Sequence, residues 1–218
     1  MLLAASSAGL SQNDPMAVPA QRWAADAAMH ELKVVEYEHN YLRYRMHIVD
    51  VKGDVVRDVI ESNDGPVARL ILKDGRPLTP EEDAAEHDRL QAMLDSPGAF
   101  ARHVKNEQSG KKMAAEMIGA LPEAMVYSYA AGQPQREHKS VNDPAEVVVD
   151  FKPNPAWNPP SLASEALTGL EGRVWIDTRT HYMTRLETSV FRGVNIGWGI
   201  FAHIYPGGNA WFEQVRVT

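Results

Sequence analysis

The chain has 218 residues, of which 44% are hydrophobic, and this length suits a single β-rich domain with one sizeable core. Its 22 basic and 29 acidic residues give a net charge of −7 without any run of five like charges, which argues against a nucleic-acid partner. The absence of cysteine excludes disulfides, thiolate metal sites, cysteine nucleophiles and a lipid-modified cysteine within this sequence.

The amino-terminal stretch MLLAASSAGL is small and apolar, which fits the end of a secretory h-region followed by an Ala/Ser-rich cleavage zone. The positively charged segment that normally precedes an h-region is missing. Residues 1–19 are therefore expected to be either the remnant of an export signal or a flexible amino terminus, and residues 20–218 are expected to form the domain. No stretch approaches the roughly 18 uninterrupted apolar residues of a membrane span, so no transmembrane segment is predicted. The sequence does not predict an oligomeric state.

The first part of the domain is expected to be a helix followed by three strands. Apolar residues at helical spacing predict an amphipathic helix over residues 20–35. Residues 42–49 alternate with a period of two, which predicts a strand with one buried face. The apolar members of this alternation are Leu42, Tyr44, Met46 and Ile48. Strands over 55–61 and 67–73 follow, separated by a turn-forming cluster, so the three strands are expected to form an antiparallel meander.

A helical segment interrupts the strands. Thr79, Pro80 and Glu82 match a capping box with proline at the first helical position, which predicts a helix from Pro80 to about Leu94. Further helix is expected over 99–118, with an interruption around Ser109 and Gly110.

The final part of the chain is again rich in β-forming residues. Short strands are predicted at 124–130 and 145–151, and a proline-rich loop at 152–166 is expected to cross the surface or an edge of the sheet. The last third is expected to be a four-stranded meander, with strands at about 171–177, 182–191, 194–205 and 209–217.

The predicted strand 194–205 has one wholly apolar face, while Gly197 and Gly199 lie on the other face. Two glycines on one face permit strong bending or the close approach of another element. The residues therefore indicate an α+β protein whose antiparallel sheet is curved.

The hairpin LEGRVWIDTRTHYMTRLE poses the question of whether its Trp-Ile-Asp stretch is scaffold or carries chemistry. Trp175 and Ile176 are expected on opposite faces of a strand, and Asp177 is expected to start the turn. This stretch is therefore interpreted as architectural.

Motifs for catalysis, metal binding and cofactor binding are missing from the sequence. The eight histidines form no short metal motif, and neither a Gly-x-Ser-x-Gly elbow nor a phosphate-binding Gly-x-x-x-x-Gly-Lys loop occurs. The acidic residues that begin the helix at Pro80 complement the helix dipole, and we interpret them as a solvated face. No catalytic residue, metal ligand or cofactor is therefore assigned.

Two features allow two interpretations each. Four arginines on the predicted meander, Arg43, Arg45, Arg57 and Arg69, form either a cationic ladder for an anionic head group or ordinary cross-strand pairs with acidic neighbours, and we favour the pairs. The aromatic and methionine residues are numerous enough to line a cavity, and equally able to fill a core.

The order of elements and three short motifs resemble the bacterial LolA/LolB-like family of periplasmic carriers that sort outer-membrane lipoproteins. The motifs are Gly-x-Val-Trp-Ile-Asp at 172–177, Thr-Arg-Leu at 184–186 and LKDGRPLTPEE at 72–82. The resemblance covers most of the chain from about residue 20, although the helical insertion at 79–121 is long for a simple carrier. It implies a periplasmic protein with a strongly curved, incomplete antiparallel β-barrel, helices on its concave or open side, and an apolar cavity for acyl chains.

These observations lead to a non-enzymatic periplasmic carrier or binding protein for an apolar ligand, which would be a lipid, an acyl chain or a lipoprotein. The residues expected to line the cavity are Leu42, Tyr44, Met46, Ile48, Leu70, Leu72, Ile196, Trp198 and Ile200. The first alternative is a cell-envelope interaction or scaffold protein whose helices fill the sheet. The second is a hydrolase that uses His47 or His203 with a nearby carboxylate.

Overall fold

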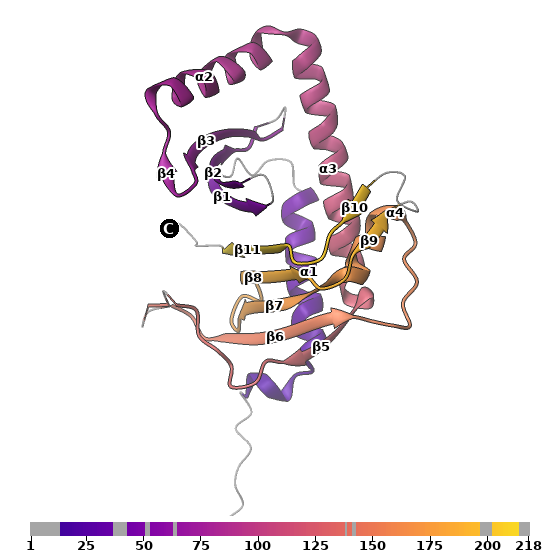
Figure 1. Cartoon of the computed structure of the whole chain (residues 1–218). Helices are drawn as coiled ribbons and strands as arrows, with labels where there is room; N and C mark the ends of the chain where they lie inside the picture. The colour runs from indigo at the N-terminus through magenta and orange to yellow at the C-terminus, as the bar shows by residue number, and fades with distance from the viewer. Residues whose placement is uncertain are drawn as a thin grey trace, which may run out of the picture.

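The computed structural model describes residues 14–36, 43–50, 53–62, 65–137, 139–140, 143–196 and 202–213, and its elements form an α+β protein with antiparallel sheets (Figure 1). The helical elements are η1 (Pro15–Ala17), α1 (Ala20–Glu36), α2 (Pro80–Asp95), α3 (Pro97–Ala124), α4 (Leu162–Glu165) and η2 (Ala166–Gly169). The strands are β1 (Arg43–Asp50), β2 (Gly53–Ile60), β3 (Val67–Lys73), β4 (Arg76–Pro77), β5 (Met125–Tyr129), β6 (Glu146–Pro153), β7 (Leu170–Asp177), β8 (Met183–Val190), β9 (Val194–Ile196), β10 (Ala202–Ile204) and β11 (Asn209–Glu213). The predicted helices at 20–35 and from Pro80, and the predicted first five strands, are confirmed.

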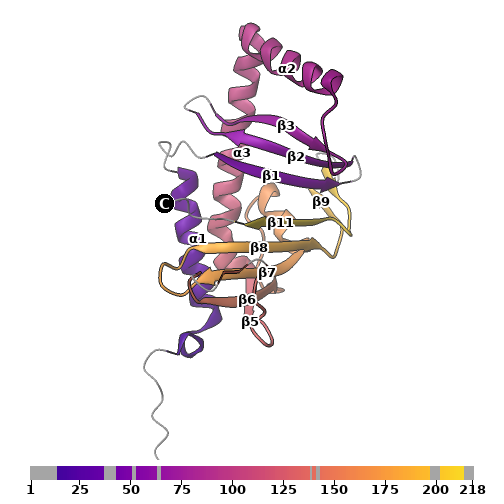
Figure 2. The same ribbon diagram turned by 90° about the vertical axis from the view of Figure 1, so that its left-hand side faces the viewer.

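Two sheets account for most of the strands. Sheet A has the order β1-β2-β3-β4, and sheet B has the order β11-β8-β7-β6-β5. Figures 1 and 2 both show the sheets one above the other, with β1 facing β11 and with α3 running beside both sheets. Across this junction the rings of His47 and Trp211 meet edge to face, with 5.9 Å between their centroids. The predicted meander of β1, β2 and β3 is confirmed, with β4 as a short addition.

The main core lies between sheet B and α1. Trp23 and Ala27 of α1 pack on Val149 and Ile176 of the sheet, and Ile176 is completely buried. The alanine-rich face of α1 has little side-chain bulk, which allows the helix to lie close to the strands. Trp23 also anchors η1, because its indole N–H donates to the Pro15 carbonyl at 3.0 Å.

The carboxyl-terminal half of α3 forms a second core with sheet B. Ala124, Met125, Phe151 and Leu167 are buried together there. The aromatic ring of Phe151 lies over Gly172, where a Cβ atom would collide with this ring and with the Glu187 carbonyl oxygen. The glycine of the Gly-x-Val-Trp-Ile-Asp stretch is therefore required by packing.

The Trp-Ile-Asp stretch is architectural, as predicted. Trp175 is buried with Ala130 and Val148 on one face of sheet B, whereas Ile176 faces α1 on the other. The Asp177 carboxylate accepts the backbone N–H groups of Arg179 at 2.7 Å and Thr180 at 3.3 Å, and so shapes the turn.

Helix α3 is longer than expected and continuous, so the predicted interruption is wrong. Ser109 remains helical with its hydroxyl donating to the Lys105 carbonyl at 2.9 Å, and Gly110 is exposed. A single glycine in an exposed helix costs only about 1 kcal/mol, which the packing of the rest of α3 offsets. Likewise, the predicted proline-rich loop is partly helical, because the Ser161 hydroxyl caps α4 by accepting the Ser164 N–H.

The predicted four-stranded meander at the carboxyl end is wrong. β11 pairs directly with β8, and the segment expected as one strand at 194–205 contains β9 and β10, which pair antiparallel with each other. Val194 is buried beside Gly169, where a Cβ atom would collide with its side chain, and Phe191 N–H donates to the Gly169 carbonyl at 3.1 Å. These contacts direct the chain away from sheet B after β8. The free edge of β8 is then available to pair with β11.

Candidate ligand pocket between sheet A and the α2–α3 hairpin

A half-open pocket of about 320 Å³ lies where sheet A faces α2 and α3. This volume is at the lower end of the range of small-molecule sites. The lining residues are Tyr44, Met46, Arg57, Val59, Pro66, Val67, Ala68, Arg89, Leu90, Met93, His103 and Glu107. We call this space the sheet A pocket.

The register of sheet A determines which strand residues line the pocket. Tyr44 lies opposite Val59, and Val59 lies opposite Ala68. In the next row, Met46 lies opposite Arg57. Because directly opposed residues project to the same face of a sheet, these side chains form one surface toward the helices.

Helix α2 is attached to the edge of β3 through two charged side chains. The Glu86 carboxylate accepts the Leu70 N–H at 2.7 Å, and the Arg89 guanidinium donates to the Ala68 carbonyl at 2.9 Å. β4 pairs only with the last two residues of β3, so α2 supplies partners for backbone groups that the ladder leaves open. The position of α2 over the pocket follows from these contacts.

Glu86 is buried, so the prediction of a solvated acidic face is wrong for this residue. Burial alone would raise the pKa of the Glu86 carboxyl, but hydrogen bonds from Arg89 and the Leu70 N–H, together with the charges of Arg89 and Arg57, hold this pKa below its usual range. Glu86 is therefore an anion beneath the pocket and forms a two-pronged ion pair with Arg89 at 2.7 and 2.8 Å.

The α3 side of the pocket is also partly polar. The His103 ring lies 2.9 Å from the Pro66 carbonyl through Nε2 and 3.9 Å from Glu107 through Nδ1. Burial and the charges of Glu61 and Glu107 raise the pKa of the Tyr44 phenol, so Tyr44 is neutral at physiological pH. The pocket thus combines apolar and polar groups in similar measure, and it is more polar than a typical small-molecule site.

A second hollow of about 330 Å³ adjoins the sheet A pocket beyond Arg89. Its lining residues are Val55, Leu70, Lys73, Glu82, Ala85, Glu86 and Arg89. Arg89 lines both spaces and therefore marks their boundary.

Of the residues predicted to line a cavity, Tyr44 and Met46 lie in the sheet A pocket and Leu70 lies in the adjoining hollow. Ile48 and Leu72 are partly buried in sheet A and line neither space. Leu42, Trp198 and Ile200 lie outside the described residues, and Ile196 belongs to β9, which contacts α4 and η2.

The helical side of the pocket was not predicted from the sequence. Leu90 and Met93 lie three residues apart on α2, next to a face that was interpreted as solvated. Their spacing from Glu86 was the available signal, because residues three and four apart share a helix face. Of the other aromatic and methionine residues, Trp23, Met125 and Trp175 fill cores.

The arginines of the meander do not form one cationic ladder. Arg43 and Arg45 both donate to the Asp58 carboxylate, at 3.0 and 3.1 Å, and these hydrogen bonds lower its pKa. Arg69 donates to Asp83 of α2 at 2.8 Å. The interpretation of cross-strand pairs is confirmed for Arg43 and Arg45, whereas Arg69 pairs with a helix residue and Arg57 lines the sheet A pocket.

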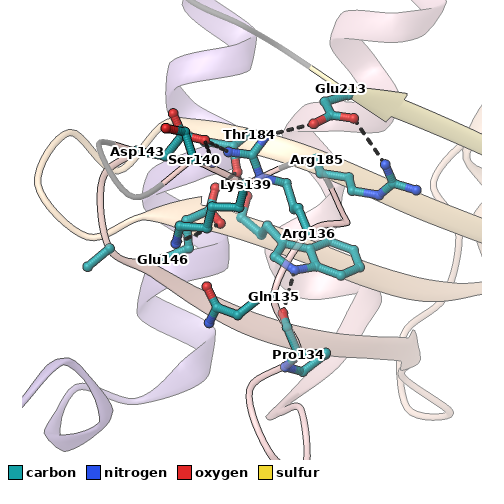
Figure 3. A network of polar contacts seen from close by, with 12 residues as sticks. Pro134, Gln135, Arg136, Lys139, Ser140, Asp143, Glu146, Thr184, Arg185 and Glu213 are labelled. Carbon is teal, nitrogen blue, oxygen red and sulfur yellow. Dashed lines mark hydrogen bonds and ion pairs between the residues drawn. The ribbon is translucent and has the colours of Figure 1, made fainter.

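A second polar cluster lies on the face of sheet B that carries Trp175 (Figure 3), and the Oε2 atom of Glu146 in it has an ion-pair contact with Lys139 but no hydrogen bond from the described residues. Arg136 donates to Glu146 at 2.9 Å and to Glu213 at 2.6 Å, and Glu213 also accepts from Arg185 at 3.1 Å. The Glu146 side chain is 1% exposed, and the Thr184 hydroxyl donates to it at 2.6 Å. These bonds connect the loop before β6 with strands β8 and β11. The cluster therefore stabilises the packing of this loop on sheet B.

The hydrolase alternative named His47 and His203. His47 contacts Asp54 at 2.6 Å within the β1–β2 hairpin and does not line the sheet A pocket, while the side chain of His203 lies outside the described residues. Among the residues that the structure describes, no three His, Cys, Asp or Glu side chains group as a metal site. None of the described helices is long and apolar enough to cross a membrane.

Comparison of the chain with protein-family models, curated proteins and solved structures found no significant match. The function is therefore inferred from the geometry of the sheet A pocket.

Proposed function

We propose that this protein is a non-enzymatic periplasmic carrier or binding protein for an apolar ligand, which is a lipid, an acyl chain or a lipoprotein. The observation that carries the proposal is the sheet A pocket, whose wall includes Met46, Val59, Leu90 and Met93. Binding would remove apolar ligand surface from water, at about 25 cal/mol per Å² before the entropic costs of association. Methionine side chains suit such a site because they adapt to ligands of different shape.

The LolA/LolB-like architecture belongs to the same proposal. In that architecture sheets A and B would form one curved, incomplete barrel with the helices on its concave side. The position of β1 beside β11, with α1 and α3 along the sheets, supports this arrangement (Figure 2). The periplasmic location is part of the same proposal, and its support is the resemblance.

The first experiment is native mass spectrometry of the purified protein, followed by solvent extraction and lipid analysis. Ala68→Phe tests the site directly, because a phenyl ring at this position in β3 would occupy the pocket. Ala84→Phe is the matched control, since Ala84 is exposed on α2 and does not line the pocket.

We expect the wild-type protein and Ala84→Phe to retain the co-purifying lipid and to bind the neutral probe N-phenyl-1-naphthylamine. Ala68→Phe should weaken probe binding by about tenfold or more, which corresponds to roughly 1.4 kcal/mol. A folded wild-type protein that carries no lipid and binds no probe would contradict the carrier proposal.

The alternative of a cell-envelope scaffold protein is favoured by one observation. The helix-facing side of sheet B is filled by α1 and α3, with Trp23 and Leu167 buried in its two cores. If the sheet A pocket binds no apolar probe, the scaffold function becomes the better proposal.

A further inference from the structure

We propose that the ligand of the sheet A pocket is a single-chain amphiphile with an anionic head group, a carboxylate or a phosphate, which is bound by Arg57. This inference rests on the proposed carrier function and adds the chemical class of the ligand. It is carried by an arginine on the pocket wall whose hydrogen-bonding groups are not used by the rest of the described structure.

The carboxylate nearest to Arg57 is already occupied. Both oxygens of Glu86 accept from Arg89, and one of them also accepts the Leu70 N–H. The Nη1 atom of Arg57 lies 3.9 Å from this oxygen, which is beyond hydrogen-bond distance. Arg57 therefore has a long-range ion pair with Glu86 but donates no hydrogen bond within the described residues.

Three other arginines of sheet A have guanidinium groups that are hydrogen-bonded to carboxylates. Arg43, Arg45 and Arg69 each donate to a carboxylate at 3.1 Å or less. Arg57 differs because it projects to the pocket face, opposite Met46, while 31% of its side chain is exposed. Its planar fork is thus accessible to a ligand, and guanidinium groups bind carboxylates and phosphates through two parallel hydrogen bonds.

The local charge balance favours an anion. Arg57 and Arg89 share the single negative charge of Glu86, so this group carries a net charge of +1 at the pocket wall. Glu107, the acidic residue that lines the pocket, lies on α3 beside His103 and brings the formal charge of the whole pocket to zero, so the excess positive charge is local to Arg57 and Arg89. A ligand anion bound to Arg57 would neutralise this local positive charge.

The surroundings of Arg57 suit the rest of an amphiphile. Its cross-strand neighbour Met46 is apolar, and Val59, Leu90 and Met93 continue the apolar wall. The pocket is open to solvent on one side, which allows a chain longer than the pocket to extend outward. The head group would lie against Arg57 and the adjoining part of the chain against this wall.

The test compares a charged probe with its neutral counterpart. The probes are cis-parinaric acid and its methyl ester, which have the same fluorescent chain and differ in the head group. The proteins are the wild type, Arg57→Gln and the matched control Arg69→Gln, whose arginine is exposed and lies outside the pocket. Displacement by dodecanoate or by dodecyl phosphate then separates carboxylate from phosphate heads.

We expect the wild-type protein to bind the acid about tenfold or more tightly than the ester, as a charge-assisted hydrogen bond would provide. Arg57→Gln should remove this preference while it keeps ester binding, and Arg69→Gln should keep both. Higher salt should weaken binding of the acid more than binding of the ester.

Equal binding of acid and ester by the wild-type protein would overturn the inference and leave the carrier function intact. An unchanged preference in folded Arg57→Gln would also overturn the role of Arg57. Failure of the wild-type protein to bind either probe would contradict the carrier function itself, and the inference with it.

Discussion

Sheets A and B are both antiparallel and both face helices, but only sheet B has a filled core. Val148, Val149 and Ile176 of sheet B are completely buried. Of the side chains that the structure describes in sheet A, only Val59 is buried to a similar degree. The difference lies in the covering helices, because α1 lies along sheet B whereas α2 reaches only the edge of β3. Helix placement therefore accounts for the sheet A pocket, while a separate hollow of about 520 Å³ is lined by strands β5 to β8 of sheet B.

The strand sequences reflect the same difference. The run Val147-Val148-Val149 of β6 is continuously apolar because α1 covers one face and the loop before β6 covers the other. β1 instead alternates, with Arg43 and Arg45 at the surface. A continuous apolar run is typical of a strand buried on both faces, and alternation is typical of a strand covered on one face.

The largest expected effect is a truncation in the core of sheet B. Ile176→Ala should lower the free energy of unfolding by about 2–5 kcal/mol, since the side chain is fully buried and its loss leaves a cavity. Ile48→Ala is the matched change in sheet A, and it should cost about 1 kcal/mol because Ile48 is only partly buried. Urea denaturation of both variants measures the difference. Equal losses would show that the two sheets are packed alike.

An intermediate effect is expected at the polar cluster of Figure 3. Arg136→Met should lower the free energy of unfolding by about 3 kcal/mol, because it removes the main partner of the buried Glu146 carboxylate. Lys139 and Thr184 stay close to that carboxylate and limit the loss. The control Arg69→Met breaks an exposed ion pair of sheet A and should cost less than about 1 kcal/mol. If Arg136→Met left the free energy of unfolding unchanged, the cluster would not stabilise the fold.

The smallest effect is expected at the start of α2. The hydrogen bond from Arg76, then those from the Thr79 N–H and Lys73, lowers the pKa of the Glu82 carboxyl to about 2. Since the folded-state pKa lies below the unfolded value, this carboxylate stabilises the fold above about pH 4.5, and the contribution is lost as the pH falls through about 2. Glu82→Gln should therefore lower the melting temperature slightly at pH 7, with the difference narrowing toward pH 2.

Thermal melts across this pH range test the expectation, and nuclear magnetic resonance of the Glu82 carboxyl carbon measures its titration directly. The exposed neighbour Glu81 is the control, because no hydrogen bond or ion pair of its side chain occurs in the described residues. A Glu82 midpoint near 4.5 would exclude the capping network as a stabilising feature.

Local signals predicted most of the elements correctly. The Thr79–Glu82 capping box marks the start of α2, and the alternation from Tyr44 to Ile48 marks β1. Such features depend on neighbours in the sequence, which is why they can be read without the fold. Tyr44 and Met46, which the alternation of β1 puts on one face, both line the sheet A pocket.

The errors concern pairings between distant segments. The sequence of 194–205 is compatible with one long strand, but the contact of Val194 with Gly169 takes this segment away from sheet B. The buried Glu86 was also missed, because its partner is a backbone N–H group of β3 that no sequence motif specifies. Of the cavity residues predicted in this segment, Ile196 belongs to the separate β9–β10 hairpin, and Trp198 and Ile200 lie outside the described residues.

By itself, the sequence determined the α+β class, the limits of α1 and α2, the meander of β1 to β3 and the architectural role of the Trp-Ile-Asp turn. Each depends on periodicity, capping or turn chemistry within a short window of sequence. The tertiary structure decided that α1 packs on sheet B and fills its core, and that α2 stops at the edge of sheet A. It also decided that Arg57 faces the pocket between sheet A and the helices α2 and α3. These outcomes depend on which distant surfaces fit together, and close packing between residues far apart in the chain has no local signature.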